Sequence, residues 1–274
     1  MRPTAASWPR RLRAAALALL AAAAPAGVSG EERSAADEIA RYRQMLEDGN
    51  PAELVEMRGA ELWTTARGPR NASLEACDLG LGPGVVEGAH ARLPRWFADT
   101  GRVEDLDSRL VTCITTLQGI PRAEAVRGWH RAGSDLEALV TFVASRSRGQ
   151  MLQAPVAHPA EAAMVAAGEA LFHRRAGPLD FSCATCHAQD DRRIRLQDLP
   201  NFDNAASARA SLATWPAYRV SQSAVWSMER RLIDCIRQMR WPEPEFGSEA
   251  IVALQAYLHR QAAGATLQAP GIKR

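Results

Sequence analysis

Apolar side chains recur along this chain with the spacing of amphipathic helices. Four stretches carry apolar residues at positions i, i+3, i+4 and i+7, namely 53–65, 160–173, 228–239 and 249–261. This spacing places the apolar side chains on one face of a helix, where a folded protein buries them. Runs of β-branched residues, which favour strands, are few. The pattern therefore predicts a mostly α-helical protein.

A further apolar run, 14–24, has the surroundings of an export signal. Three arginines precede it within positions 10–13, and Pro25 and small residues follow it. A basic, an apolar and a small-residue segment in this order make up a secretory signal peptide. The run is shorter than the roughly 20 residues that cross a membrane, and no second apolar stretch suggests a membrane span. We expect residues 1–30 to be a cleaved signal peptide and the mature protein to be periplasmic.

The candidate chemistry is concentrated in the segment Cys183-Ala-Thr-Cys186-His187. C-x-x-C-H is the attachment signature of a c-type haem. The two thiols add to the porphyrin vinyl groups, and the imidazole becomes the proximal iron ligand. A redox-active thiol pair and half a zinc site are the alternatives, but the sequence has no second C-x-x-C and no H-x-x-x-H. We predict one covalently bound haem c, held by Cys183, Cys186 and His187.

The chain also contains an internal repeat that surrounds this motif. Gly-Ala-Glu-Leu-Trp at 59–63 resembles Gly-Glu-Ala-Leu-Phe at 168–172. Downstream, each copy has a proline flanked by aromatic residues and, 19 positions later, a cysteine in a helical segment: Pro94 and Cys113 in the first copy, Pro216 and Cys235 in the second. Equal order and equal spacing favour a duplicated domain over chance similarity.

Together, the haem motif and the repeat predict two tandem cytochrome c-like domains. Arg, Gln, Pro and His interrupt the helical pattern near residue 150, so we place the first domain at 31–150 and the haem-binding domain at 151–262. Residues 263–274 are left as a C-terminal tail. The first copy has Cys77-Asp-Leu-Gly-Leu where the second has its motif. We align Cys77 with the first cysteine of the motif and expect the first domain to have lost its haem site.

The number of cysteines constrains the remaining thiols. Disulfides persist in an oxidising compartment. A disulfide between Cys77 and Cys113 is the economical pairing and closes a loop of about 36 residues, whereas two free buried thiols are the alternative. Of five cysteines, two on the haem and two in this bridge leave Cys235 alone.

Cys235 lies where a small cytochrome c carries its distal haem ligand. The repeat favours Cys235 for this role, because the first copy also has a cysteine there. A thioether ligand raises the haem potential, whereas a thiolate donates more strongly to ferric iron and remains a nucleophile. The other candidates for the distal ligand are Met239, Met228 and a histidine such as His259 or His173.

Arg231 lies one helical turn before Cys235, on the same helix face. A guanidinium in this place can hold a small oxyanion beside the sulfur. A structural role is equally open, because Arg109 occupies the same place in the first copy. We expect the neighbouring Arg230, Arg237 and Arg240 to be solvated or to pair with haem propionates. The net charge of +2 gives no indication of a nucleic-acid partner.

Several segments together resemble the SoxA subunit of the SoxAX cytochromes, which start bacterial thiosulfate oxidation. The matching segments are 77–84, 93–95, 183–187, 215–219 and 230–235. The resemblance covers nearly the whole mature chain and is more specific than the haem motif alone. It implies the single-haem type of SoxA, in which the Cys77–Cys113 disulfide stands in place of a first haem.

The resemblance also implies an activity, that of an L-cysteine S-thiosulfotransferase. In such enzymes the cysteine matching Cys235 is the distal haem ligand and the catalytic residue, found as a persulfide, and the arginine matching Arg231 binds substrate. The implied partners are a SoxX-type small cytochrome c subunit, forming a heterodimer, and the carrier protein SoxYZ. Thiosulfate is joined oxidatively to a carrier cysteine, and two electrons leave through the haem.

Two other functions fit the same residues. A periplasmic electron-transfer cytochrome c would have His/Met ligation and a dispensable Cys235. A thiosulfate dehydrogenase, which couples two thiosulfates to tetrathionate, would share the His/Cys ligation. The need for a carrier protein separates that enzyme from the thiosulfotransferase.

Overall fold

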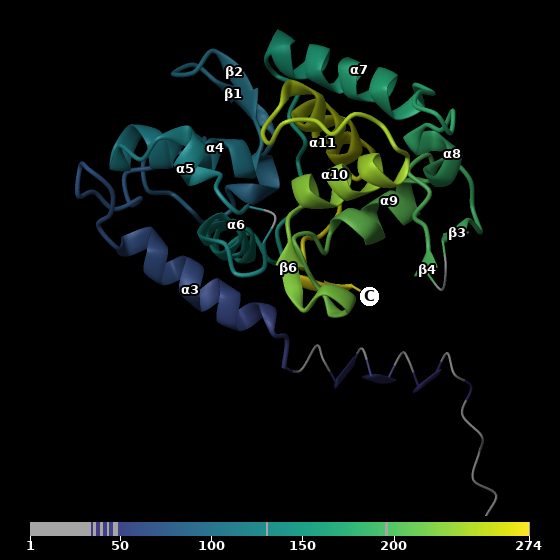
Figure 1. The fold of residues 1–274 in the computed structure, drawn as a ribbon, viewed down its shortest axis with the longest axis horizontal. Coiled ribbons are helices and arrows are strands. Elements are labelled where there is room, and N and C mark those ends of the chain that lie inside the picture. The colour runs from purple at the N-terminus through teal and green to yellow at the C-terminus, as the bar shows by residue number, and fades with distance from the viewer. Residues whose placement is uncertain are drawn as a thin grey trace, which may run out of the picture. The chain divides into compact units, whose positions relative to one another are not determined.

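The computed structural model describes residues 34, 37–38, 41–42, 44–45, 49–129, 131–194 and 197–273 (Figure 1). The expected signal peptide lies outside them. The chain divides into two units, 1–42 and 43–274, and the elements named below all belong to the second. In the first unit, residues 37–38 and 41–42 are helical. Among the described residues, no helix is both long and apolar enough to span a membrane.

In the second unit we call residues 49–150 the first half and residues 151–273 the second half. The first half contains the helices α3 (Ala52–Thr64), α4 (Leu106–Cys113), α5 (Arg122–Ala125) and α6 (Asp135–Ser145), the short helical turns η1 (His90–Arg92) and η2 (Ile114–Gln118), and the strands β1 (Arg95–Phe97) and β2 (Arg102–Glu104). These helices gather on one side of the unit in Figure 1.

The second half repeats this order with additions. It contains the helices α7 (Pro159–His173), α8 (Cys183–His187), α9 (Ala205–Leu212), α10 (Met228–Gln238) and α11 (Glu249–Gln261), the turn η3 (Val220–Gln222), and the strands β3 (Arg193–Ile194), β4 (Gln197–Asp198), β5 (Ala217–Arg219), β6 (Ala224–Trp226) and β7 (Gly271–Lys273). All four helices predicted from the sequence are present, with bounds within one residue of the prediction. The mostly helical class is confirmed.

The strands form small sheets that support the helices. β1 pairs with β2 and β5 pairs with β6, in both cases as antiparallel hairpins. β7 adds to β5 in parallel, so the end of the predicted tail is the third strand of the order β6-β5-β7. The earlier part of the tail is also held, because the Leu267 amide donates to the Gln150 carbonyl at 2.8 Å. Residues 265–273 therefore follow a turn as a packed segment, in which Ala265, Leu267 and Ala269 are buried.

Helix crossings at two glycines show that the halves share one design. α3 crosses α6 at Gly59, where a β-carbon would lie 2.0 Å from the Ala138 carbonyl oxygen. α7 crosses α11 at Gly168, where a β-carbon would lie 1.9 Å from the Ala253 carbonyl oxygen. Backbones this close leave room only for glycine. Both halves thus close their first helix on their last in the same way.

A short loop after each first helix fixes how the halves align. Isolated β-bridges join Arg67 to Ala72 and Ala176 to Phe181, a constant shift of 109 positions that also relates the two crossing glycines. Extended over the next residues, this shift pairs Cys77 with Cys186, the second cysteine of the haem motif. The sequence-based alignment of Cys77 with the first motif cysteine was therefore wrong. It compared only the two cysteine-containing segments and did not use the preceding loop, whose β-bridges fix the spacing.

Each half has its own hydrophobic core. The first-half core is built around Trp63, Leu79, Leu110 and Phe142, and the second-half core around Phe172, Ile233, Leu254 and Tyr257. Trp129 packs against both cores. Two cores are what a duplicated domain would produce, and the boundary near residue 150 stays a prediction.

Candidate functional site

The haem motif forms the short helix α8, and a capping box fixes its start. The Ser182 hydroxyl accepts from the Thr185 amide at 3.1 Å, while the Thr185 hydroxyl accepts from the Ser182 amide at 3.0 Å. Reciprocal caps of this kind satisfy helix-terminal amides that otherwise have no partner. One helical turn therefore carries both motif cysteines and His187.

The His187 ring is oriented by the loop that follows α8. Its Nδ1 atom lies 2.8 Å from the Pro200 carbonyl oxygen, which can only accept a hydrogen bond. This contact assigns the ring proton to Nδ1 and leaves the Nε2 lone pair for a metal. The Phe202 amide donates to the His187 carbonyl at 2.7 Å, and the Phe202 ring lies 5.4 Å from the imidazole. A histidine held in this way fits the role of a proximal haem ligand.

α10 carries the second group of candidate residues. Ser227 caps the helix by accepting from the Arg230 amide at 3.3 Å. Cys235 is a free thiol, as are the two motif cysteines. Burial raises the pKa of the Cys235 thiol, and the charges of Arg231 and Arg219 lower it in part. These arginines are the local features that favour a thiolate at this position.

The three free thiols lie within electrostatic reach of one another. The pKa of the Cys183 thiol is raised to about 12, chiefly by burial and next by the Cys235 sulfur. The Cys186 sulfur likewise raises the pKa of Cys235, although less than burial does. The Arg231 charge lowers the pKa of His187, after the larger effect of burial. The structure thus brings the predicted haem-binding residues together with Cys235 and Arg231.

Arg231 has fewer partners than its first-half counterpart. Its Nη1 atom forms an ion pair with the adjacent Asp234 at 2.8 Å. The counterpart Arg109 donates through Nε to the Asp78 carbonyl at 2.6 Å and pairs through Nη1 with Asp99 and Glu104 at 2.9 and 3.2 Å. Arg109 is a structural residue by this measure, whereas Arg231 keeps guanidinium donors for a ligand.

Arg219 is a site residue that the sequence reasoning did not single out. The residue is 9% exposed, and its Nε atom is buried without a hydrogen-bond partner in the described part of the chain. Its guanidinium lies over the Trp226 ring, 5.3 Å from the centroid, and its charge lowers the pKa of Cys235. The only sequence signal for it was its place at the end of segment 215–219.

Two other arginines of α10 form ion pairs with glutamates rather than interacting with Cys235. Arg230 pairs with Glu137 at 3.2 Å and lies 4.4 Å from the Trp226 ring centroid. Arg237 pairs with the exposed Glu243 at 2.9 Å. Arg237 is solvated, as expected, whereas Arg230 is not, because its side chain is 14% exposed and pairs with the buried Glu137.

The other candidates for the distal ligand have contacts of their own. Met228 and Met239 are both buried in the second-half core. His259 is buried, and its Nδ1 atom lies 2.9 Å from the Leu93 carbonyl oxygen in the first half. His173 packs its ring against Phe172 at 5.1 Å between centroids. Cys183 packs against the same core as the two methionines, so burial alone does not exclude them. The proximity of Cys235 to both motif thiols favours it as the distal ligand, which stays a prediction.

In the first half a disulfide occupies the corresponding place. Cys77 and Cys113 are bonded, with an S–S distance of 1.99 Å and a Cα–Cα distance of 5.5 Å. The predicted pairing is confirmed, and the alternative of two free thiols is wrong. The positions equivalent to this pair in the second half are Cys186 and Cys235, which are both free. The same two positions are thus bridged directly in one half and left open in the other.

The residue that replaces the motif histidine in the first half is Asp78. Its carboxylate accepts from the amides of Gly80 at 2.7 Å and Gly82 at 3.0 Å, which closes a tight loop. It offers no imidazole to an iron. At these positions the first half therefore lacks the first motif thiol, which Leu74 replaces, and the ring nitrogen that a c-type haem uses.

These features define a c-type cytochrome domain, and comparison with known proteins agrees. The model of the SoxA/TsdA cytochrome c domain family matches residues 58–152 and 167–267, so the chain belongs to this family. A cytochrome c domain implies haem c, and the free donor set of Cys183, Cys186 and the oriented His187 fits that group.

Individual relatives sharpen this assignment. The chain is 47% identical over 267 residues to the L-cysteine S-thiosulfotransferase subunit SoxA of Hydrogenophilus thermoluteolus, which covers 94% of this chain and 98% of that protein. It is 31% identical over 246 residues to the subunit of the same name from Hydrogenobacter thermophilus, covering 88% of this chain and 92% of that one. The crystal structure of SoxXA from P. pantotrophus has the same fold, with a TM-score of 0.71 at 24% identity over 85% of this chain and 84% of that chain.

Proposed function

We propose that this protein is the SoxA-type subunit of an L-cysteine S-thiosulfotransferase, which joins thiosulfate oxidatively to a cysteine of the carrier protein SoxYZ. The observation that carries the proposal is the grouping of Cys235, Arg231 and Arg219 with the haem motif. A plain electron carrier has no use for a lone nucleophilic sulfur flanked by two arginines. The names of the relatives point to the same activity.

The proposed cofactor is one haem c, attached to Cys183 and Cys186, with His187 as the proximal and Cys235 as the distal ligand. When bound, the haem accepts the electrons that the reaction releases. The first domain, 31–150, carries no haem in this proposal, and the haem belongs to the second domain, 151–262. The support is the donor set of α8, which Asp78 and the Cys77–Cys113 disulfide replace in the first half.

The reaction is an oxidative joining of two sulfur atoms. A carrier thiol and thiosulfate give a carrier S–S–sulfonate with the loss of one proton and two electrons. Cys235 can act as a covalent relay that takes up the thiosulfate sulfur and passes it on by exchange. Arg231 and Arg219 would hold the sulfonate end of the dianion through charge-assisted hydrogen bonds. Their charges would also lower the pKa of the Cys235 thiol, against the larger effect of burial, which raises it.

The proposed partners follow from the thiosulfotransferase activity. The SoxXA complex with the same fold supports a heterodimer with a SoxX-type small cytochrome c. SoxYZ would supply the acceptor cysteine, and thiosulfate would be the small-molecule substrate. We place the protein in the periplasm, exported by the predicted signal peptide 1–30 and oxidised there at Cys77 and Cys113.

A reconstituted assay tests this function directly. The mature chain, co-produced with its SoxX-type partner, is mixed with thiosulfate, SoxYZ and oxidised cytochrome c as electron acceptor. We expect acceptor reduction that depends on SoxYZ, a mass gain on the carrier cysteine equal to one thiosulfate sulfonate adduct, and one covalent haem on the chain by pyridine haemochrome analysis. Carrier-independent formation of tetrathionate would contradict the proposal and identify a thiosulfate dehydrogenase.

Replacement of Arg231 tests its role in substrate binding. A charged hydrogen bond contributes about 1.5–3 kcal/mol, so Arg231→Gln should raise the KM for thiosulfate by roughly 10- to 150-fold. The haem spectrum and the melting temperature should stay near those of the wild type. The matched control is Arg237→Gln on the same helix, whose arginine pairs with Glu243 away from the sulfur. Equal KM values for the two variants would remove Arg231 from the binding site.

A further inference from the structure

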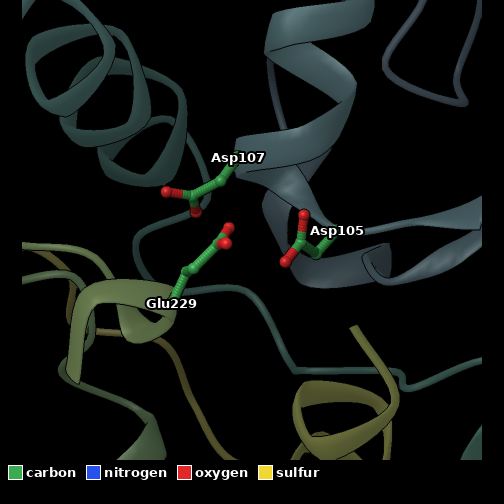
Figure 2. Close-up of side chains that lie close together, drawn as sticks. All are labelled: Asp105, Asp107 and Glu229. Carbon is green, nitrogen blue, oxygen red and sulfur yellow. The ribbon is translucent and has the colours of Figure 1, made fainter. Parts of the chain in front are cut away.

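Three buried carboxyl groups meet where the two halves of the structure join (Figure 2). Asp105 and Asp107 belong to the start of α4 in the first half, and Glu229 belongs to the first turn of α10 in the second half. One carboxylate oxygen from each lies within 4.8 Å of the others. The three residues are 1%, 5% and 0% exposed, respectively. Figure 2 shows the Glu229 carboxyl directed toward both aspartates.

One oxygen of this cluster has no partner. Glu229 Oε1 accepts a hydrogen bond from the Gly247 amide, but Oε2 is buried and makes no hydrogen bond within the described part of the chain. A buried polar atom without a partner costs about 1–3 kcal/mol. As an ionised oxygen, Oε2 is an acceptor without a donor. As a protonated oxygen, it could donate only to one of the two aspartates beside it. A cation bound by all three carboxylates would satisfy it as well and would also balance their charge.

The aspartates are held in place by their own donors. The Ser108 amide donates to Asp105 Oδ1 at 2.8 Å, and the Gln255 side chain donates to Asp105 Oδ2. Ser227 hydrogen-bonds to Asp107. These donors hold both aspartate carboxyls beside that of Glu229.

The charge of the cluster is only partly balanced by its surroundings. The N-termini of α4 and α10 both face it, and each contributes about half a positive charge. Against three carboxylates this leaves roughly two negative charges. Burial and mutual repulsion raise the pKa of Asp107 to about 8 and that of Glu229 well above its ordinary value. The Arg122 charge lowers the pKa of Glu229 slightly, but its Nη2 atom donates to the Phe246 carbonyl.

We infer that Asp105, Asp107 and Glu229 form a Ca²⁺ site that ties α10 to the first half of the molecule. Because the three oxygens lie within 4.8 Å of one another, a point exists that is about 2.8 Å or less from each, which is compatible with the 2.3–2.6 Å of Ca²⁺. Mg²⁺ demands near-ideal octahedral geometry and usually keeps several waters, which suits a cluster of buried carboxyls less well. Carboxylate oxygens are also the ligands that this hard cation prefers. The ion would fix the first turn of α10, two residues before Arg231.

Calcium titration of the haem-loaded mature protein tests the site. After chelation and dialysis, isothermal titration calorimetry with CaCl₂ should show one site, and saturating Ca²⁺ should raise the melting temperature by several degrees, because a ligand that binds only the folded state stabilises it. MgCl₂ should bind at least tenfold more weakly. No binding heat and no shift in melting temperature at millimolar Ca²⁺ would overturn the inference and leave a protonated cluster in its place.

Variants locate the bound ion. Glu229→Gln keeps the acceptor for the Gly247 amide but removes the charge, and it should weaken Ca²⁺ binding by about a hundredfold or more. Glu243→Gln makes the same charge change at an exposed position and should bind as the wild type does. If Glu229→Gln fails to fold, Asp107→Asn takes its place. Unchanged affinity in the cluster variant would place the ion elsewhere and refute the site.

Discussion

Cys235→Met is expected to yield a folded haem protein without carrier-dependent thiosulfate turnover. A methionine thioether can replace a cysteine as distal iron ligand, but it is not a nucleophile and cannot form the S–S bond of a relay. Loss of a covalent nucleophile costs on the order of a thousandfold or more in rate. The haem potential should rise as well, since a thioether stabilises ferric iron less than a thiolate does.

Low-temperature EPR, visible absorption and the SoxYZ assay measure these effects together. The wild type should show low-spin His/thiolate signals, and the variant should show the absorption band of methionine ligation. Met239→Leu is the matched control, because Met239 lies one turn further on the same helix and is buried in the core. A wild type with His/Met signals that Met239→Leu abolishes, and without SoxYZ-dependent thiosulfate turnover, would point to an electron-transfer cytochrome instead.

The elements that the sequence predicted correctly are those that follow a local pattern. Each helix has an apolar face, and the 3.6-residue periodicity of that face can be recognised from the sequence alone. The Cys77–Cys113 bond was also within reach, because the three thiols that remain after haem attachment allow only three pairings in an exported chain. Both conclusions need only the spacing of residues along the sequence and the expectation of an oxidising compartment.

The parts that the sequence did not reveal depend on contacts between distant segments. Arg219 becomes a site residue only because β5 and α10 bring it to Cys235. In the sequence, Glu229 is an ordinary acidic residue in the first turn of α10. Only the fold brings Asp105 and Asp107 of α4 close to it. The alignment of Cys77 with Cys186 required the β-bridge that precedes each cysteine. Such features arise from tertiary packing, on which helical periodicity carries no information.

The disulfide of the first half should be its main covalent support. Its cysteines are 36 positions apart in sequence, and a bond that closes a loop of this length stabilises a protein by about 4 kcal/mol on a chain-entropy estimate. The double variant Cys77→Ala/Cys113→Ala should lose this stability, which corresponds to a melting temperature lower by roughly 8–16 °C in a chain of this size. The Soret and EPR signals should stay unchanged, because the haem-binding residues belong to the other core.

Chemical denaturation with and without dithiothreitol separates the bond from its side chains. Reduced wild type should unfold at the denaturant concentration of the alanine variant, since thioether bonds to haem resist the reductant while the disulfide does not. The double variant Cys77→Ser/Cys113→Ser should be less stable than the alanine variant, and the difference measures the added cost of burying two hydroxyl groups. Equal stability of oxidised and reduced wild type would contradict this role. A loss of haem signal on reduction would instead show that the bridge in the first half holds the haem site of the second.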